Sequence, residues 1–257
     1  MSRVQADDLT VRRGGRAILD RVSLDIDGAG FVAVIGANGA GKSTLLACLA
    51  GLLGPDAGEA RFDSRPVLRW RPAELAKVRA YVPQNPRCEW PISVARLVAL
   101  GLTPVLPTFG SLPASLAGKV AQALAACDLD EKADQPATTL SGGELARAML
   151  ARALVGDPAV LIVDELTAGL DPRHALDALS RMKALAAGGR LVIASIHDLT
   201  LVARHADRIV ALKAGRVVAD GPTREVLTAA LLKEVFEVEA RITDTDQGPL
   251  VDLLAPL

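Results

Sequence analysis

The sequence predicts an α/β protein with a mostly parallel sheet core, an N-terminal antiparallel β subdomain and an inserted helical lobe. Three observations support this fold. Apolar runs short enough to be buried strands recur along the chain, at FVAVIG (31–36), AVLIV (159–163) and LVIASI (191–196). Helical patterns alternate with these runs, as in a parallel sheet whose strands are joined by helices. The section from about 85 to 154 has helical patterns without strand patterns, which predicts the lobe.

The N-terminal half begins with a hairpin and a strand–loop–helix unit. Residues 4–27 are expected to form two strands around a turn in RRGGR (12–16). The strand at 31–36 leads through a glycine-rich stretch into an apolar helix at 43–51. In the middle section we expect helices at 93–102 and 114–127, a loop at 103–113 between them, and a third helix within 139–154.

The C-terminal half returns to alternating strands and helices. The expected order is a strand in AVLIVDEL (159–166), a helix at 172–187, a strand at 191–196, a helix at 198–205 and a hairpin at 208–221 that turns at Lys213-Ala214-Gly215. We expect a single domain over 1–257, whose core comprises 1–84 and 155–240 and which ends in a C-terminal extension at 241–257.

Composition and charge argue against several classes of protein. The chain has 257 residues, of which 50% are hydrophobic, enough for a sizeable core. Its formal net charge of −1 does not suit a nucleic-acid binder, so no nucleic-acid partner is expected. The three cysteines lack pairing or metal spacing, which is typical of a reducing cytoplasm. We see no secretory leader and no run of about 20 apolar residues, so any membrane link is expected to pass through a partner.

The strand–loop–helix unit carries GANGAGKST (36–44), which fits the P-loop pattern G-x-x-x-x-G-K-[ST]. Its glycines let backbone N–H groups wrap phosphates, Lys42 places a positive charge on the β- and γ-phosphates, and Ser43 can ligate Mg²⁺. The alternative is an ordinary glycine turn, which the flanking strand and helix argue against. The predicted nucleotide-binding residues here are Gly36, Ala37, Asn38, Gly39, Ala40, Gly41, Lys42, Ser43 and Thr44.

Polar side chains at the ends of other apolar runs are candidates for the same nucleotide site as the P-loop. LIVDE (161–165) delivers Asp164, which can position Mg²⁺, and Glu165, which is placed to polarise an attacking water. Gln84 ends the run AYVPQ and can ligate Mg²⁺, and His197 follows LVIASI and can contact the γ-phosphate. Taken alone, each residue is also typical of a helix cap or a solvated turn. The nearby P-loop favours the functional interpretation.

The helix within TLSGGELARAMLARAL (139–154) begins with a capping box and two glycines. Ser141 can cap the first turn, and Glu144 can reach back to complete the box. A capping box needs no glycines, so Gly142 and Gly143 indicate a helix end that receives an anion. The loop has no lysine and no metal ligand. It therefore predicts half of a phosphate site, completed by a nucleotide held on a second copy of the chain.

In this order, the P-loop, VPQ, LSGGE, LIVDE, AGLD (168–171) and SIHD (195–198) resemble the ATPase subunit of an ABC (ATP-binding cassette) transporter over roughly residues 4–240. The resemblance implies a P-loop NTPase (RecA-like) fold and a head-to-tail homodimer that holds two ATP molecules, with Mg²⁺, between P-loop and signature. It also implies that Glu165 is the catalytic base and His197 the switch histidine. The residues implied to bind ATP in trans are Ser141, Gly142, Gly143, Glu144 and, from the D-loop, Asp171.

Three positions depart from the family pattern. Arg13 stands where the family often has a tyrosine that stacks on adenine. A guanidinium plane can also stack on a base, so ATP can still bind while base selectivity is left open. Glu144 ends the signature where glutamine is common, which we expect to be tolerated. Leu166 replaces a proline that usually follows the catalytic glutamate, which removes a rigid turn before the D-loop.

Further stretches, such as SVARLVALGLTP (93–104) and EVLTAALLKEVFEV (225–238), resemble importers of the iron–siderophore, haem or cobalamin type. The resemblance implies permease subunits docked near 85–113, an indirectly acting substrate-binding protein, and a peripheral location on the cytoplasmic face of the bacterial inner membrane. One alternative is an ABC ATPase for another cargo or for export. Others are a non-transport ABC ATPase, which would carry a second cassette or a long coiled coil, and a P-loop kinase or GTPase, which would leave LSGGE unexplained.

Overall fold

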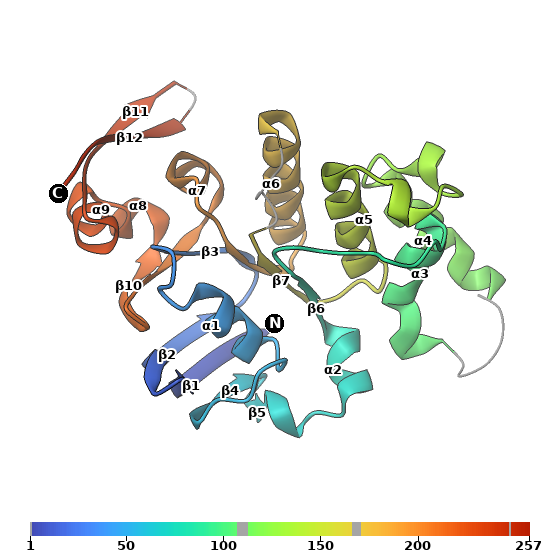
Figure 1. Cartoon of the computed structure of the whole chain (residues 1–257), viewed down its shortest axis with the longest axis horizontal. Coiled ribbons are helices and arrows are strands. Elements are labelled where there is room, and N and C mark those ends of the chain that lie inside the picture. Colours follow the sequence, from blue (N-terminus) through green and yellow to red (C-terminus); the bar gives the residue numbers. More distant parts are fainter. Residues whose placement is uncertain (1, 107–112, 166–170, 247) are drawn as a thin grey trace.

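The computed structural model describes residues 2–106, 113–165, 171–246 and 248–257 (Figure 1). A six-stranded sheet forms its centre, in the order β10-β9-β3-β8-β7-β6, and every pairing in it is parallel except that of β10 with β9. The predicted mostly parallel α/β core is therefore confirmed. Its strands are β3 (Gly30–Gly36), β6 (Arg79–Val82), β7 (Val160–Asp164), β8 (Leu191–Ser195), β9 (Arg208–Lys213) and β10 (Arg216–Pro222).

Alternate residues of the central strands face two separate hydrophobic cores, because successive side chains of a strand point to opposite faces. On β3, Phe31 and Ile35 belong to the core that includes α6 (Pro172–Ala187) and α7 (Leu199–His205). Val32 and Val34 belong to the core shared with α1 (Lys42–Leu49) and the N-terminal sheet. Both faces are covered, so these strands are continuously apolar, and short apolar runs identified them correctly.

The N-terminal sheet is antiparallel, in the order β2-β1-β4-β5. The predicted first hairpin is confirmed, since Arg13 pairs with Arg16 across the turn at Gly14-Gly15. The third and fourth strands and the helix α2 (Pro72–Val78) after them were not predicted, because their sequences are short and mix polar with apolar residues. The strands are β1 (Arg3–Arg13), β2 (Arg16–Asp27), β4 (Ala57–Phe62) and β5 (Arg65–Pro66).

The described residues of the middle section form helices, 3-10 turns and loops, and their only β pairing is an isolated bridge between Ser93 and Pro136. The predicted helix at 93–102 is shorter than expected, because the chain passes into a 3-10 turn at Leu100–Val105 that contains Pro104. The helices are α3 (Val94–Ala99), α4 (Ala114–Ala125) and α5 (Gly142–Leu154). They cluster beyond the β6 edge of the central sheet (Figure 1). The division of the chain at 84 and 154 stays a prediction.

The C-terminal segment forms a hairpin for which no structure was predicted. It follows α8 (Thr223–Val226) and α9 (Ala229–Phe236) and consists of β11 (Val238–Thr245) and β12 (Gly248–Pro256). The Val251 N–H donates to Thr200 Oγ1 on α7 at 3.1 Å, which ties the hairpin to the core. Over the described ranges, none of the helices combines the length and the apolar character that crossing a membrane requires.

Candidate functional site

The carboxyl ends of the parallel strands bring most of the predicted site residues together. The P-loop follows β3, Asp164 ends β7, and Gln84 and His197 each lie two residues beyond their strands, β6 and β8. Parallel strands end at the same edge of a sheet, so these four segments meet although they are far apart in the sequence. We call the following residues the P-loop cluster: Lys42, Ser43, Gln84, Asp164, Glu165, Ser195 and His197.

Gly41 makes the tight bend between the P-loop and α1. Its φ of 103° lies in the left-handed region that glycine tolerates best. A Cβ at this position would lie only 2.8 Å from both the Ile18 carbonyl oxygen and Leu19 Cδ2 of β2. The P-loop therefore packs so closely against the N-terminal sheet that a side chain here has no room.

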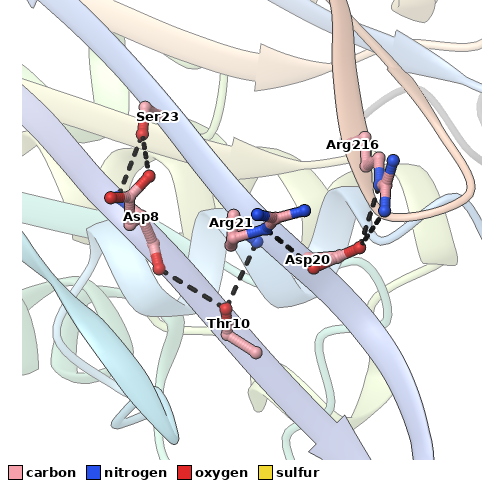
Figure 2. A network of polar contacts seen from close by, with 6 residues as sticks. All are labelled: Asp8, Thr10, Asp20, Arg21, Ser23 and Arg216. Atoms are coloured by element: carbon pink, nitrogen blue, oxygen red, sulfur yellow. Dashed lines mark hydrogen bonds and ion pairs between the residues drawn. The ribbon is translucent and has the colours of Figure 1, made fainter.

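A second contact ties the N-terminal sheet to the P-loop through the turn between β9 and β10. The Asp20 N–H donates to the Gly215 carbonyl at 2.9 Å, and the Gly215 N–H donates to the Ala40 carbonyl at 3.1 Å. Figure 2 shows the Arg216 guanidinium of β10 reaching the Asp20 carboxylate of β2, with Nε 2.9 Å from Oδ2. The N-terminal sheet and the turn between β9 and β10 thus both support the P-loop.

Lys42 is buried, at 5% exposure, and turns back on its own loop. Its ammonium donates to the carbonyl oxygens of Gly36 at 2.8 Å and Ala37 at 3.2 Å. Burial lowers the pKa of Lys42, and the charges of Glu165 and Asp164 oppose that shift. A poorly solvated ammonium gains more from an anion than an exposed one does, so this charge is well placed to hold a phosphate.

Ser195 links the two acidic residues at the end of β7. Its hydroxyl donates to Asp164 Oδ1 at 2.7 Å, and it accepts from the Glu165 N–H at 2.9 Å. Ser43 donates to the same Asp164 oxygen at 3.1 Å. No role for Ser195 was predicted from the sequence. The signal available was a single hydroxyl at the end of an otherwise apolar strand, and the structure buries that residue to 1% exposure.

The Glu165 carboxylate is held between the two other strand ends. The Gln84 amide Nε2 donates to Oε2, and His197 Nε2 hydrogen-bonds to Oε1. Glu165 itself is 8% exposed and has a left-handed φ of 52°, which directs its side chain out of the line of β7. Tyr81 of β6 was also missed; burial, reinforced by the Asp164 charge, raises its pKa to about 12, so its hydroxyl stays protonated at neutral pH.

The signature residues lie at the exposed N-terminus of α5, and the predicted capping box is present. Ser141 Oγ accepts from the Glu144 N–H at 3.3 Å, and Glu144 Oε2 accepts from the Ser141 N–H at 2.9 Å. A Cβ on Gly142 would meet nothing within 4 Å. Across the described part of the chain, neither Ser141 nor Glu144 is hydrogen-bonded or ion-paired to the P-loop, and Figure 1 places α5 away from α1.

The D-loop is described only at its end. Asp171 caps α6 and is exposed; its Oδ1 accepts from the His174 N–H at 3.0 Å, and this bond lowers the pKa of Asp171. Residues 166–170 lie outside the described residues. They include Leu166, for which an effect on the D-loop was predicted, and the first three residues of AGLD (168–171).

Arg13 lies exposed at the end of β1. Its guanidinium is close enough to α1 to lower the pKa of Cys48, although burial dominates and raises that pKa to about 11. Arg13 therefore stands near the first helix after the P-loop. Contact with a base stays a prediction.

Comparison with known proteins identifies a matching family and similar sequences. A family model described as ABC transporter matches residues 19–168. The chain is similar to a hemin import ATP-binding protein of Nocardia farcinica, with 41% identity over 237 residues that cover 91% of this chain and 82% of the relative. It is also similar to the hemin import ATP-binding protein of Rhodopseudomonas palustris, with 40% identity over 253 residues, 95% of this chain and 92% of the relative.

Solved structures have the same fold. A transporter described as metal-chelate type, in an inward-facing conformation, aligns with a TM-score of 0.84 at 22% identity and covers 100% of this chain and 98% of that chain. A dimeric ATP-binding cassette in a post-hydrolysis state, bound to ADP and Pi, aligns with a TM-score of 0.77 at 27% identity. That alignment covers 86% of this chain and 99% of the cassette.

Proposed function

Because the chain belongs to the ABC transporter family, we propose that it is the ATP-hydrolysing subunit of an importer for haem or a related iron chelate. The observation that carries the proposal is the P-loop cluster, in which a P-loop lysine, two acidic residues, a glutamine and a histidine meet at one sheet edge. Relatives about 40% identical over nine tenths of the chain are named for hemin import, which supports the cargo class. Cobalamin stays a weaker alternative.

ATP would lie on the P-loop, with its phosphates against the backbone N–H groups of 36–44 and the Lys42 ammonium. The oxygen donors for Mg²⁺ would be Ser43, Gln84 and Asp164, of which Ser43 Oγ and Asp164 Oδ1 already lie 3.1 Å apart. In the described ranges, no three His, Cys, Asp or Glu side chains could hold a metal by themselves. Phosphate and water oxygens would complete the shell, as suits Mg²⁺, which would neutralise phosphate charge when bound.

Glu165 would act as the base that takes the proton of the attacking water, and His197 would hold that water or the γ-phosphate. The Glu165 carboxylate accepts one hydrogen bond from Gln84 and makes one with His197, which leaves lone pairs on both oxygens for a water molecule. Gln84 precedes the lobe, so a change in its hydrogen bond to Glu165 on ATP binding would couple the nucleotide to the helices.

The second half of the site would come from another copy of the chain. Ser141, Gly142, Gly143 and Glu144 form a polar helix N-terminus, and Asp171 lies exposed at the start of α6. In a head-to-tail homodimer these residues would close over ATP held by the partner's P-loop. The lobe near 85–113 would dock on permease subunits at the cytoplasmic face of the membrane, and a substrate-binding protein would deliver the cargo.

The test of the enzymatic part is Glu165→Gln, which keeps the shape of the side chain but removes its basicity. We expect ATP binding to persist, turnover to fall by at least about a hundredfold, and an ATP-bound dimer to accumulate. ATP hydrolysis and light scattering measure the two effects. Hydrolysis at the wild-type rate would remove Glu165 as the base.

The cargo is tested in cells that lack this chain. We expect wild-type protein, but not Glu165→Gln protein, to restore growth on haemin as the sole iron source. Matched cultures supplied with a ferric siderophore or dependent on cobalamin uptake separate the cargo classes. Restoration of cobalamin uptake alone would overturn the haem assignment while leaving the ATPase assignment intact.

A further inference from the structure

Lys132 reaches the signature from a neighbouring 3-10 turn, Asp130–Lys132. Its ammonium lies 2.7 Å from Glu144 Oε1, and both side chains are partly buried, at 35% and 22% exposure. Leu129 precedes the turn and holds it in place: its side chain is fully buried, and its carbonyl oxygen accepts a hydrogen bond from the Lys132 N–H at 3.0 Å. Lys132 therefore stands on a fixed support and not on a free loop.

The two oxygens of Glu144 have separate partners. Oε2 accepts from the Ser141 N–H within the capping box, and Oε1 accepts from Lys132. The Lys132 hydrogen bond, followed by that of Ser141, lowers the pKa of Glu144 to about 2. Glu144 is thus ionised at neutral pH, and Lys132 supplies the positive charge that pairs with it.

We propose that Lys132 is a positioning residue of the signature, which neutralises Glu144 and so lets the phosphates of a partner's ATP approach the N-terminus of α5. The inference rests on the proposed head-to-tail dimer. A helix N-terminus attracts anions because its free N–H groups point outward, and an ionised carboxylate in the first turn weakens that attraction. With Lys132 beside it, the pair adds no net charge where the phosphate arrives.

The proposal predicts a ladder of affinities that follows the net charge of the Lys132–Glu144 pair. Glu144→Gln leaves a net charge of +1 on the pair, and Lys132→Met leaves −1. The wild type and the double variant that carries both substitutions leave a net charge of 0. Glutamine can also complete a capping box, so the helix end keeps its shape in Glu144→Gln. About 10 Å away in water, a unit charge interacts weakly with a phosphate group that carries one to two negative charges, so we expect roughly a threefold change in affinity for each unit of charge.

The experiment measures the ATP concentration that gives half-maximal dimer, by light scattering of the full chain in the Glu165→Gln background. The parent is the Glu165→Gln chain that keeps both Lys132 and Glu144. Relative to this parent, adding Glu144→Gln should lower the ATP concentration for half-maximal dimer about threefold, and adding Lys132→Met should raise it about threefold. The double variant should return to within twofold of the parent, as should Lys132→Arg. Lys119→Met removes a charge from the exposed face of α4 in the same lobe and serves as the matched control. Thermal unfolding without ATP is recorded for every variant.

The direction of the Glu144→Gln effect decides between this role and a merely structural ion pair. If Lys132 only fastened the helix cap, either single variant would lower the unfolding temperature and weaken ATP-driven dimerisation. A weaker response of Glu144→Gln, or an unchanged response of Lys132→Met, would therefore overturn the proposal. Ser141→Arg checks the dimer itself. If Ser141→Arg does not impair ATP-driven dimerisation, the signature does not act in trans, and the proposed head-to-tail dimer fails together with the inference, while the ATPase assignment still stands on the Glu165→Gln test.

Discussion

In the proposed function the P-loop cluster and the signature end of α5 both meet phosphate, yet their residues differ in burial and in internal contacts. Lys42, Asp164 and Glu165 are at most 8% exposed, and each is already hydrogen-bonded to another residue of its own chain. Ser141 and Gly142 are exposed, and a Cβ added to Gly142 would meet open space. The charged residues of the cluster are packed within the chain, with Ser43, Gln84 and His197 exposed beside them, whereas Ser141 and Gly142 have an open face.

This difference separates two requirements of the proposed reaction. Chemistry needs charged groups in a poorly solvated, preorganised setting, where electrostatic interactions are strong. Coupling needs a surface that gains its partner only when ATP is present, so it cannot be completed inside one subunit. The contrast predicts that damage to the cluster is confined to its own chain, while damage to the signature acts across the dimer.

The strongest test of that contrast mixes two inactive chains. Lys42→Ala disables the P-loop, and Ser141→Arg blocks the signature, so neither homodimer has an intact composite site. A mixed dimer combines both defects in one site and leaves the other intact. We expect ATP hydrolysis, which needs a complete composite site, to rise from near zero to roughly a quarter of the wild-type level in an equal mixture. No recovery, under conditions in which heterodimers are detected, would mean that the signature serves its own chain.

Two glycine substitutions test the packing difference. Gly41→Ala forces a Cβ into backbone 2.8 Å away at a φ of 103°, so we expect the free energy of unfolding to fall by about 2 kcal/mol or more. Gly142→Ala enters open space at the start of a helix, so we expect a change within about 0.5 kcal/mol. Denaturant titration without nucleotide measures both. Gly142→Ala should instead raise the ATP concentration needed for dimerisation; equal losses of stability would erase the distinction.

Much of the fold could be predicted because its core strands are buried on both faces. Phe31 to Ile35 alternate between two cores, so the whole run is apolar and stands out from its surroundings. β4 and β11, the first strand of the C-terminal hairpin, escaped prediction because polar residues stand at every second or third place in them. Their positions depend on tertiary contacts, such as the hydrogen bond of Val251 to Thr200, that no local pattern records.

The site divides in the same way. Residues within motifs were predicted, since glycine spacing and strand-end acids reflect local chemistry. Ser195, Tyr81 and Lys132 were missed because each acts through a partner distant in sequence or on a separate turn. Lys132 lies twelve residues before Glu144, in a turn with no motif of its own. Only the folded lobe brings its ammonium to the signature.

The smallest expected effect concerns acid stability of the signature, which should be independent of the P-loop cluster. The pKa of Glu144 is lowered from an ordinary 4.5 to about 2, so its ionised form stabilises the folded state above pH 4.5. That contribution is lost as the pH falls from 4.5 toward 2, because the unfolded chain takes up the proton first. We expect the unfolding temperature of the wild type, relative to that of Glu144→Gln, to be constant from pH 7 to 5 and to decline between pH 4.5 and 3. Parallel curves over this range would mean that Lys132 and Ser141 do not hold the Glu144 carboxylate in solution, and the signature would then be open at its acidic residue as well as at its glycines.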